Sequence, residues 1–255
     1  MRKLWAVSIY TIRENIRSKI FYVIMLFALV VIASSFLFSK ISGEMEARVI
    51  VDVGLGMIEL FAFLMSIFGA VRLILLEMEN KTIYLLLSRP IRRYVYILGR
   101  YLGMLVIVLV NILIMFGGLM ALLVARGYPF QLIYIGAVGL IFAKIVIITA
   151  VGLLLSLVST SAVTSITTSF FIWILGHFSQ EIKFLTEKST DIAGKTLGKM
   201  VYYLIPHFEY FNLKDYLELT GPVYGMGIFW VIAYCAVYSG IMLCLSMLLF
   251  EGREF

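Results

Sequence analysis

The apolar residues of this chain are gathered into long runs that short polar segments separate. A helix needs about 18 or more mostly apolar residues to cross roughly 30 Å of hydrocarbon. Six runs reach this length, at residues 21–38, 53–76, 95–125, 131–158, 162–180 and 223–250. Because backbone polar groups must be paired inside lipid, each run is predicted to form a transmembrane helix.

Hydroxyl groups rather than charges separate the fourth run from the fifth. They belong to Ser156, Ser159, Thr160, Ser161, Thr164 and Ser165. One long bent helix is the alternative, but a continuous helix over 131–180 would be far too long for a single crossing. We therefore predict two helices joined by a short connection.

Residues 2–19 precede the first run and have a helical repeat of their own. One face carries Trp5, Ile9, Ile12, Ile16 and Ile20, and the other carries Arg13, Glu14 and Arg17. This pattern predicts an amphipathic helix that lies in the headgroup layer. The alternative is a basic leader that only orients the first span. A cleavable signal peptide is not expected, because charges continue to Lys19 and no A-x-A-like site follows closely.

Composition agrees with a membrane protein. Apolar residues make up 62% of the 255 residues and charged residues 14%, whereas a soluble domain is about half apolar and a quarter charged. The predicted fold class is all-α integral membrane, with one transmembrane domain over 1–255 and six transmembrane helices. The net charge of +6 lies mostly beside membrane ends and predicts no nucleic-acid partner.

The basic residues predict the orientation. They are concentrated before the first span and between the second and third spans, at Arg2, Lys3, Arg13, Arg17, Lys19, Lys81, Arg89, Arg92, Arg93 and Arg100. Those segments, including 77–93, are therefore expected in the cytoplasm, and an even number of spans places both termini there too. The segment 181–222 is then extracytoplasmic, although it also carries five lysines.

Motifs of enzyme chemistry are missing from the sequence. Neither H-E-x-x-H nor G-x-S-x-G occurs, so no catalytic residue and no metal site is predicted. Gly194-Lys195-Thr196 resembles the end of a phosphate-binding loop, but Ser189 stands where that motif needs its first glycine. The scattered methionines are read as packing residues, and Cys235 and Cys244 as unpaired thiols.

A few ionisable residues fall within the runs. Lys144 lies deep in the fourth run and Glu59 in the second, and each needs a partner inside the bundle. They could pair, and a proton relay is one reading of such a pair. His177, beside Trp173, is either a pathway residue or a histidine satisfied at the interface.

The segment 77–93 is the most polar interruption between two early spans. Leucines at 85–87 supply an apolar surface, Thr82 can cap a short helix, and Pro90 limits it. Such a helix can insert into a groove of a soluble partner, and its arginines can pair with carboxylates there. The alternative is a solvated basic loop that only enforces topology.

A resemblance favours the first reading. Glu79-Asn80-Lys81-Thr82, the leucine run, Ser88-Arg89-Pro90-Ile91-Arg92-Arg93 and Gly99-Arg100 resemble the signature of type-2 ABC exporter permeases. Lys81 replaces the usual glycine and Arg100 the usual lysine. The leader, the six spans and the aromatic segment 206–212 before the last span fit the same layout.

The resemblance implies a permease subunit of an ATP-driven exporter in the inner or plasma membrane. Two permeases, as a homodimer or a heterodimer, would work with two separate ABC ATP-binding subunits, which hold the ATP and magnesium. The segment 77–93 would be the coupling helix, and its expected docking residues are Glu79, Thr82, Leu86, Arg89, Pro90, Arg92 and Arg93.

The resemblance also implies a pathway lined in part by the fifth span. Its candidate residues are Thr164, Thr167, Thr168, Trp173 and His177, although the hydroxyls could equally serve helix packing. The segment 181–222 would form short re-entrant helices at an outer gate. Competing functions are a non-transporting membrane anchor or accessory subunit, and a membrane enzyme acting on lipid.

Overall fold

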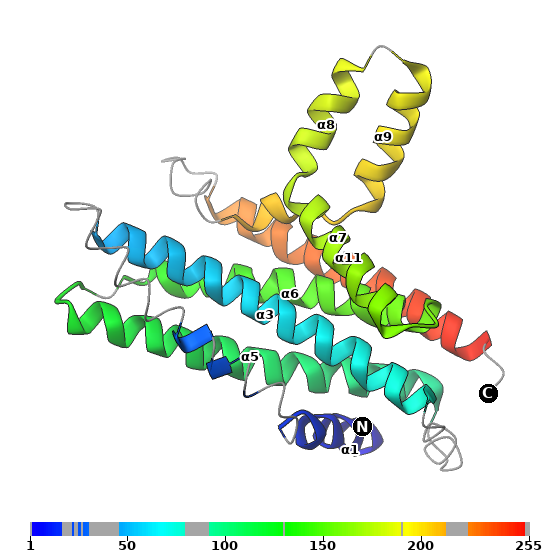
Figure 1. The fold of residues 1–255 in the computed structure, drawn as a ribbon, viewed down its shortest axis with the longest axis horizontal. Helices are drawn as coiled ribbons and strands as arrows, with labels where there is room; N and C mark the ends of the chain where they lie inside the picture. The colour runs from blue at the N-terminus through cyan, green and yellow to red at the C-terminus, as the bar shows by residue number, and fades with distance from the viewer. Residues whose placement is uncertain are drawn as a thin grey trace.

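The structure is a computed structural model that describes residues 2–16, 22, 25–26, 28–30, 46–79, 92–129, 131–189, 191–212 and 224–252. Within these ranges every regular element is a helix (Figure 1). In the described part of the chain, four helices are long and apolar enough to span a membrane: α3 (Glu46–Glu79), α5 (Arg93–Ala125), α6 (Ile133–Val158) and α11 (Tyr224–Gly252). These helices confirm the predicted runs 53–76, 95–125, 131–158 and 223–250 as helical.

The fifth predicted span is broken. Helix α7 (Ala162–His177) has 16 residues, and α8 (Ser179–Lys188) leaves it at an angle of 70°. At 1.5 Å per residue α7 is about 24 Å long, which is shorter than the hydrocarbon layer. The bent pair counts as a fifth span only when taken together. The first predicted span, 21–38, lies mostly outside the described residues, as does most of the coupling segment.

The connection between α6 and α7 is short, as predicted. Helix α6 ends at Val158 and α7 begins at Ala162. The hydroxyls pair with backbone carbonyls there: Thr164 donates to Ser161 at 2.8 Å, and Ser165 donates to Leu155 at 3.3 Å. The reading of one long bent helix is therefore wrong.

A glycine ends α5. Gly127 has a φ of +80°, a conformation that is cheap for glycine alone. Its N–H donates to Val124, and the next N–H, from Tyr128, donates to Leu123. This pair of bonds is a Schellman motif, and it lets the chain reverse into α6 within a few residues.

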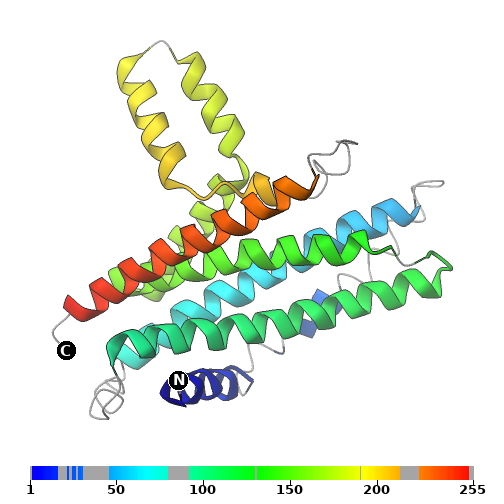
Figure 2. The same ribbon diagram turned by 180° about the vertical axis from the view of Figure 1, so that it is seen from behind.

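Helices α3, α5 and α6 form the centre of the bundle, with α11 packed along α6 (Figures 1 and 2). Small and hydroxyl residues bring α3 and α6 close together. The hydroxyls of Ser66 and Thr149 lie 2.6 Å apart, and a Cβ added at Gly152 would lie 3.1 Å from Ile67. Such bonds between membrane helices contribute about 0.6 kcal/mol each on average.

Helix α1 (Arg2–Ile16) packs along the first half of α5, near the end of the bundle where α3 ends and α11 ends (Figures 1 and 2). Val7, Ser8, Thr11 and Asn15 are buried, whereas Trp5, Ile9 and Ile16 are exposed. The predicted face of Trp5, Ile9 and Ile16 therefore points away from the protein. Residues 17–20 of the predicted helix lie outside the described part of the chain.

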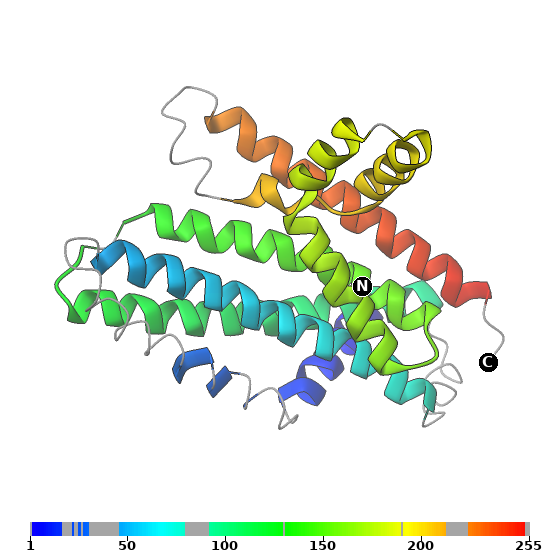
Figure 3. The ribbon, with the colours of Figure 1, turned by 45° about the horizontal axis from the view of Figure 1, so that its top comes forward.

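The predicted outer segment is largely helical. After α8 the chain turns into α9 (Ile192–Leu204), and η2 (Phe208–Phe211) follows. Helices α8 and α9 pack against each other as a hairpin that stands away from the bundle (Figures 1 and 3). Asp191 caps α9 by accepting from the Gly194 N–H at 3.4 Å.

Candidate functional site

Three ionisable side chains meet inside the bundle, from three different helices. Lys144 of α6 donates from Nζ to Glu59 Oε1 of α3 at 2.8 Å. The same oxygen lies 2.9 Å from His177 Nε2, at the end of α7. We call Glu59, Lys144 and His177 the buried charge cluster. The structure thus brings together a pair and a histidine that the sequence singled out separately.

The lysine of this cluster is almost fully buried. The side chain of Lys144 is 6% exposed and that of Glu59 is 16% exposed. A charge in such a place is costly unless it is paired. The cluster thereby ties the middle of α6 to α3 and to the last turn of α7.

The histidine ring is fixed by its second nitrogen. His177 Nδ1 lies 2.9 Å from the backbone oxygen of Trp173, which can only accept a hydrogen bond, so Nδ1 carries a hydrogen. The other nitrogen, Nε2, lies 2.9 Å from Glu59 Oε1 and 3.5 Å from Lys144 Nζ. A proton relay through these groups stays a prediction.

Aromatic rings pack against the histidine of the cluster. Trp173 stacks on Phe63 with ring centroids 4.6 Å apart and lies 4.6 Å from the ring of His177. On the other side, the ring of Phe208 in η2 lies 5.3 Å from His177. Gly176 permits this approach, because a Cβ there would lie 2.5 Å from the Phe208 ring.

The proposed pathway residues divide between two faces of α7. Thr164, Thr167 and Thr168 are exposed. Trp173 and His177 instead turn inward, toward α3 and η2. The sequence missed this division because the tryptophan and the histidine are fixed by contacts with distant segments.

The structure describes two of the predicted docking residues as whole side chains. Arg92 is exposed, and its guanidinium lies 3.3 Å from the Tyr94 hydroxyl. Arg93 donates to the backbone oxygens of Phe250 and Glu251, at 3.1 and 2.7 Å, so it joins the start of α5 to the end of α11. Glu79 is the last residue of α3, while Thr82, Leu86, Arg89 and Pro90 lie outside the described residues.

Arg100 has a structural role that sequence reasoning missed. Its side chain is 1% exposed and donates to Glu14 of α1 at 2.7 Å. Gly99 and Gly103 flank it, and a Cβ at these positions would lie 2.6 Å from Val7 and 2.7 Å from Thr11. The Gly-x-x-x-Gly spacing within an apolar run was the available signal, because it is typical of close helix contacts in membranes.

A second histidine lies among tyrosines above α11. The Tyr234 hydroxyl accepts from the backbone N–H of His207 at 3.0 Å, and the rings of Tyr202 and Tyr210 have centroids 4.3 and 5.6 Å from the imidazole. Burial lowers the pKa of His207, because the charged imidazolium loses hydration there. The neutral ring is therefore favoured.

Comparison with known proteins assigns the family. A family model described as "ABC-2 family transporter protein" matches residues 2–255. A search among curated proteins returned no match. Together with the apolar helices, the match identifies a multi-pass membrane permease that does not itself hydrolyse ATP, and it implies an ABC ATP-binding partner. The chain belongs to the ABC-2 family of transporter proteins.

Proposed function

We propose that the chain is the permease subunit of an ATP-driven exporter in the inner or plasma membrane, with both termini in the cytoplasm. Two permeases, most simply two copies of this chain, enclose the pathway, and two ATP-binding subunits supply ATP hydrolysis. The family match over residues 2–255 is the observation that carries this proposal.

The helices that flank residues 77–93 support a role for this segment as the coupling segment. Helix α3 ends and α5 begins at the end of the bundle where α1 and the end of α11 also lie (Figure 2). Arg93 joins the start of α5 to α11, and Arg100 joins it to α1. A push on the segment would therefore reach α1, α3, α5 and α11 together.

The threonine face of α7 supports a pathway between two copies. Thr164, Thr167 and Thr168 are exposed on a helix that is otherwise rich in apolar residues. Hydroxyl groups that face lipid have no hydrogen-bond partners there. Between two facing helices they can bond to each other or to cargo. The buried charge cluster fixes the rotation of α7 that presents this face.

Charge reversal in the coupling segment tests the proposal. Arg89→Glu/Arg92→Glu should abolish co-purification of the ATP-binding subunit and cargo-stimulated ATPase activity, while Arg93 keeps its bonds to α11. Arg13→Glu, an exposed reversal on α1, should leave the complex intact. Retention of both association and transport by the double variant would refute the coupling role. A complex with normal association but no cargo-dependent ATPase would indicate the non-transporting anchor instead.

A further inference from the structure

The α8–α9 hairpin has two chemically different sides. In α9, Gly194, Gly198 and Tyr202 recur every four residues and so lie along one face of the helix. A Cβ at Gly198 would collide with Thr186 of α8, so the two helices are closely packed. Helical spacing then places Lys195 and Lys199 on one flank of α9 and Leu197, Val201 and Leu204 on the other.

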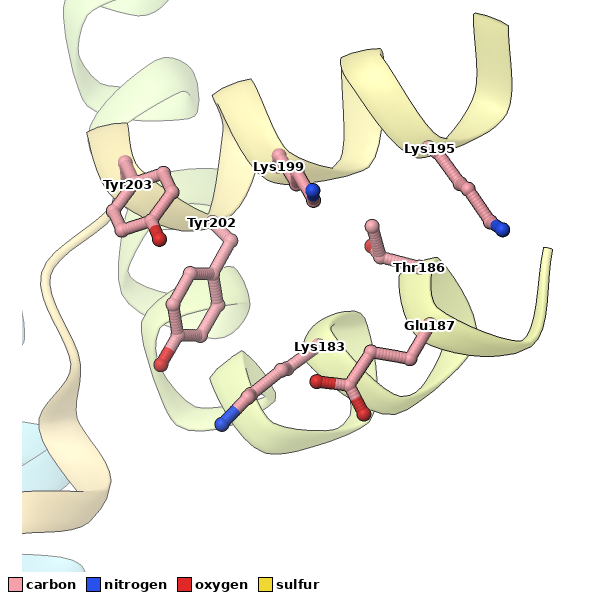
Figure 4. A pocket seen from close by; sticks show the side chains of 7 residues that line it. All are labelled: Lys183, Thr186, Glu187, Lys195, Lys199, Tyr202 and Tyr203. Atoms are coloured by element: carbon pink, nitrogen blue, oxygen red, sulfur yellow. The ribbon is translucent and has the colours of Figure 1, made fainter. Parts of the chain in front are cut away.

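A hollow of about 290 Å³ lies on the lysine side. Its lining residues are Lys183, Thr186 and Glu187 from α8 and Lys195, Lys199, Tyr202 and Tyr203 from α9 (Figure 4). We call this hollow the lysine groove. A second hollow of about 370 Å³ shares Lys183, Glu187 and Tyr202 with it and continues toward η2.

The lysine groove carries a net positive charge. It contains three ammonium groups and one carboxylate, that of Glu187. Among the residues that the structure describes, Lys183, Lys195 and Lys199 form no ion pair. Glu209 adds a second carboxylate in the adjoining hollow, where it accepts from the Gln180 backbone N–H at 2.9 Å, so the lysines still outnumber the carboxylates by three to two. The groove therefore favours an anion.

Tyrosines add neutral donors to these charges. Burial, with the nearby Tyr210, Tyr203 and Glu209, raises the pKa of Tyr202. A tyrosine phenol keeps its hydrogen at neutral pH in any case, and it can donate to an oxyanion. Three ammonium groups and a phenol are donors of the kind that bind a phosphate group.

The other side of the hairpin is apolar and open. Leu185, Leu197 and Leu204 are each about two-thirds exposed, at 66%, 64% and 68%. Phe171 and Leu175 of α7, and Phe178 at the base of the hairpin, are exposed as well. A ligand that satisfies both surfaces must combine a charged head with an apolar body.

We propose that the lysine groove binds the phosphate headgroup of an anionic amphiphile, whose hydrocarbon part lies against the apolar flank of α8 and α9. Two sources share this chemistry: a resident phospholipid of the membrane and the exported cargo. The binding site itself is independent of ATP coupling, and only its assignment to cargo rests on the proposed function.

Binding can be measured on the full chain in phosphatidylcholine nanodiscs, without the ATP-binding subunit. The probe is a fluorescent short-chain phosphatidylglycerol, and its phosphatidylcholine analogue is the reference. Phosphatidylglycerol should bind about ten-fold more tightly than the analogue and more weakly as salt rises, because the attraction is electrostatic. Lys195→Glu/Lys199→Glu should lower the affinity for phosphatidylglycerol about ten-fold.

Lys188→Glu is the matched control. Lys188 lies on the same hairpin, with its ammonium 4.5 Å from the Phe184 ring centroid, and does not line the groove. This variant should bind within about two-fold of the wild type. Lys195→Gln/Lys199→Gln removes charge without adding repulsion, and should lose affinity at an unchanged unfolding temperature. Wild-type affinity in both double variants, or equal binding of the two lipids, would overturn the proposal.

A second arm identifies the source. With the co-purified ATP-binding subunit and ATP, cargo would move between leaflets, and the double charge reversal would slow that movement. A resident lipid would bind equally well but would show no ATP-dependent movement. Because affinity is measured on the chain alone, failure of the ATP-binding subunit to associate would count against the proposed function and leave the binding result standing.

Discussion

Lys144 illustrates what a single residue can decide in an apolar bundle. It donates a hydrogen bond to Glu59 of α3, 85 positions earlier in the chain, and lies beside His177 of α7, 33 positions later. Because an unpaired ammonium in this place would lose its hydration without compensation, the pair fixes which faces of three helices meet. The buried charge cluster thus fixes the rotation of α7 about its own axis.

Breaking the pair from one side should be more harmful than removing both charges. Glu59→Gln leaves Lys144 buried without a carboxylate, and should destabilise the folded protein by about 3–5 kcal/mol. Glu59→Gln/Lys144→Met should be less destabilised than Glu59→Gln alone. Thermal unfolding in detergent measures both, with Lys188→Met as the exposed control. If the double variant were the less stable of the two, the cluster would not be a compensated ion pair.

At the scale of elements, packing against α5 determines where α1 lies. Its exposed Trp5, Ile9 and Ile16 fit the headgroup layer, but its position is set by the opposite face, which meets Gly99 and Gly103. The Arg100–Glu14 pair lies within this contact. The helix is therefore held by the protein as well as by any lipid.

Filling the glycine contact should loosen α1. A Cβ at Gly103 would lie 2.8 Å from the Ser8 backbone oxygen, which cannot rotate away, so Gly103→Ala should cost about 1–3 kcal/mol. Hydrogen exchange of residues 5–15 should become at least about five-fold faster. Gly117→Ala, in the same helix but with nothing within 4 Å of the added Cβ, should leave this rate unchanged. Equal rates in the two variants would contradict the contact.

The contact of η2 with α9 and α11 should weaken in acid. Because the pKa of His207 is lowered by burial, the folded state binds fewer protons than the unfolded state below the ordinary value of about 6.5. The stabilisation is complete above that value and is lost as pH falls through the lowered pKa. Hydrogen exchange of residues 205–212, corrected for its intrinsic pH dependence, should therefore accelerate between pH 7 and pH 5.

His207→Phe keeps an aromatic ring beside Tyr210 but cannot be protonated, so its corrected exchange should vary much less with pH. His177, whose ring also contacts Phe208, is retained in this variant and serves as an internal control. An unchanged pH response in His207→Phe would show that protonation of His207 is not the cause.

At the scale of the whole molecule, the exposed side of α7 and the apolar flank of the α8–α9 hairpin remain uncovered in a single chain. In the proposed dimer the threonine face of α7 lies toward the second copy. The buried charge cluster then lies on the opposite face of α7, where it anchors this helix to α3 and α6.

Cysteine cross-linking tests the dimer arrangement. In a Cys235→Ala/Cys244→Ala background, Thr164→Cys or Thr168→Cys should cross-link two copies with a short bifunctional reagent. Ser169→Cys, next to Thr168 but buried, should not. Cross-linking in membranes is read from gel mobility. Equal yields at 168 and 169 would mean that α7 does not present its threonine face to a partner.

The sequence by itself determined the class of the protein and most of its long helices, because an apolar run of sufficient length can only be helical in lipid. It also determined the α6–α7 break, through the hydroxyls at 156–165, and the family, through the polar pattern at 79–100. Each of these is a local property of consecutive residues.

Only the tertiary structure decided which side chains meet. The sequence singled out Glu59, Lys144 and His177, but their convergence on one carboxylate oxygen depends on the rotation of three helices. It could not reveal that α7 ends at His177 and bends, because residues 162–180 are apolar enough for one straight span. The lysine groove likewise requires the folding back of α9 on α8, since lysines 12 and 16 positions from Lys183 share a surface only in the hairpin.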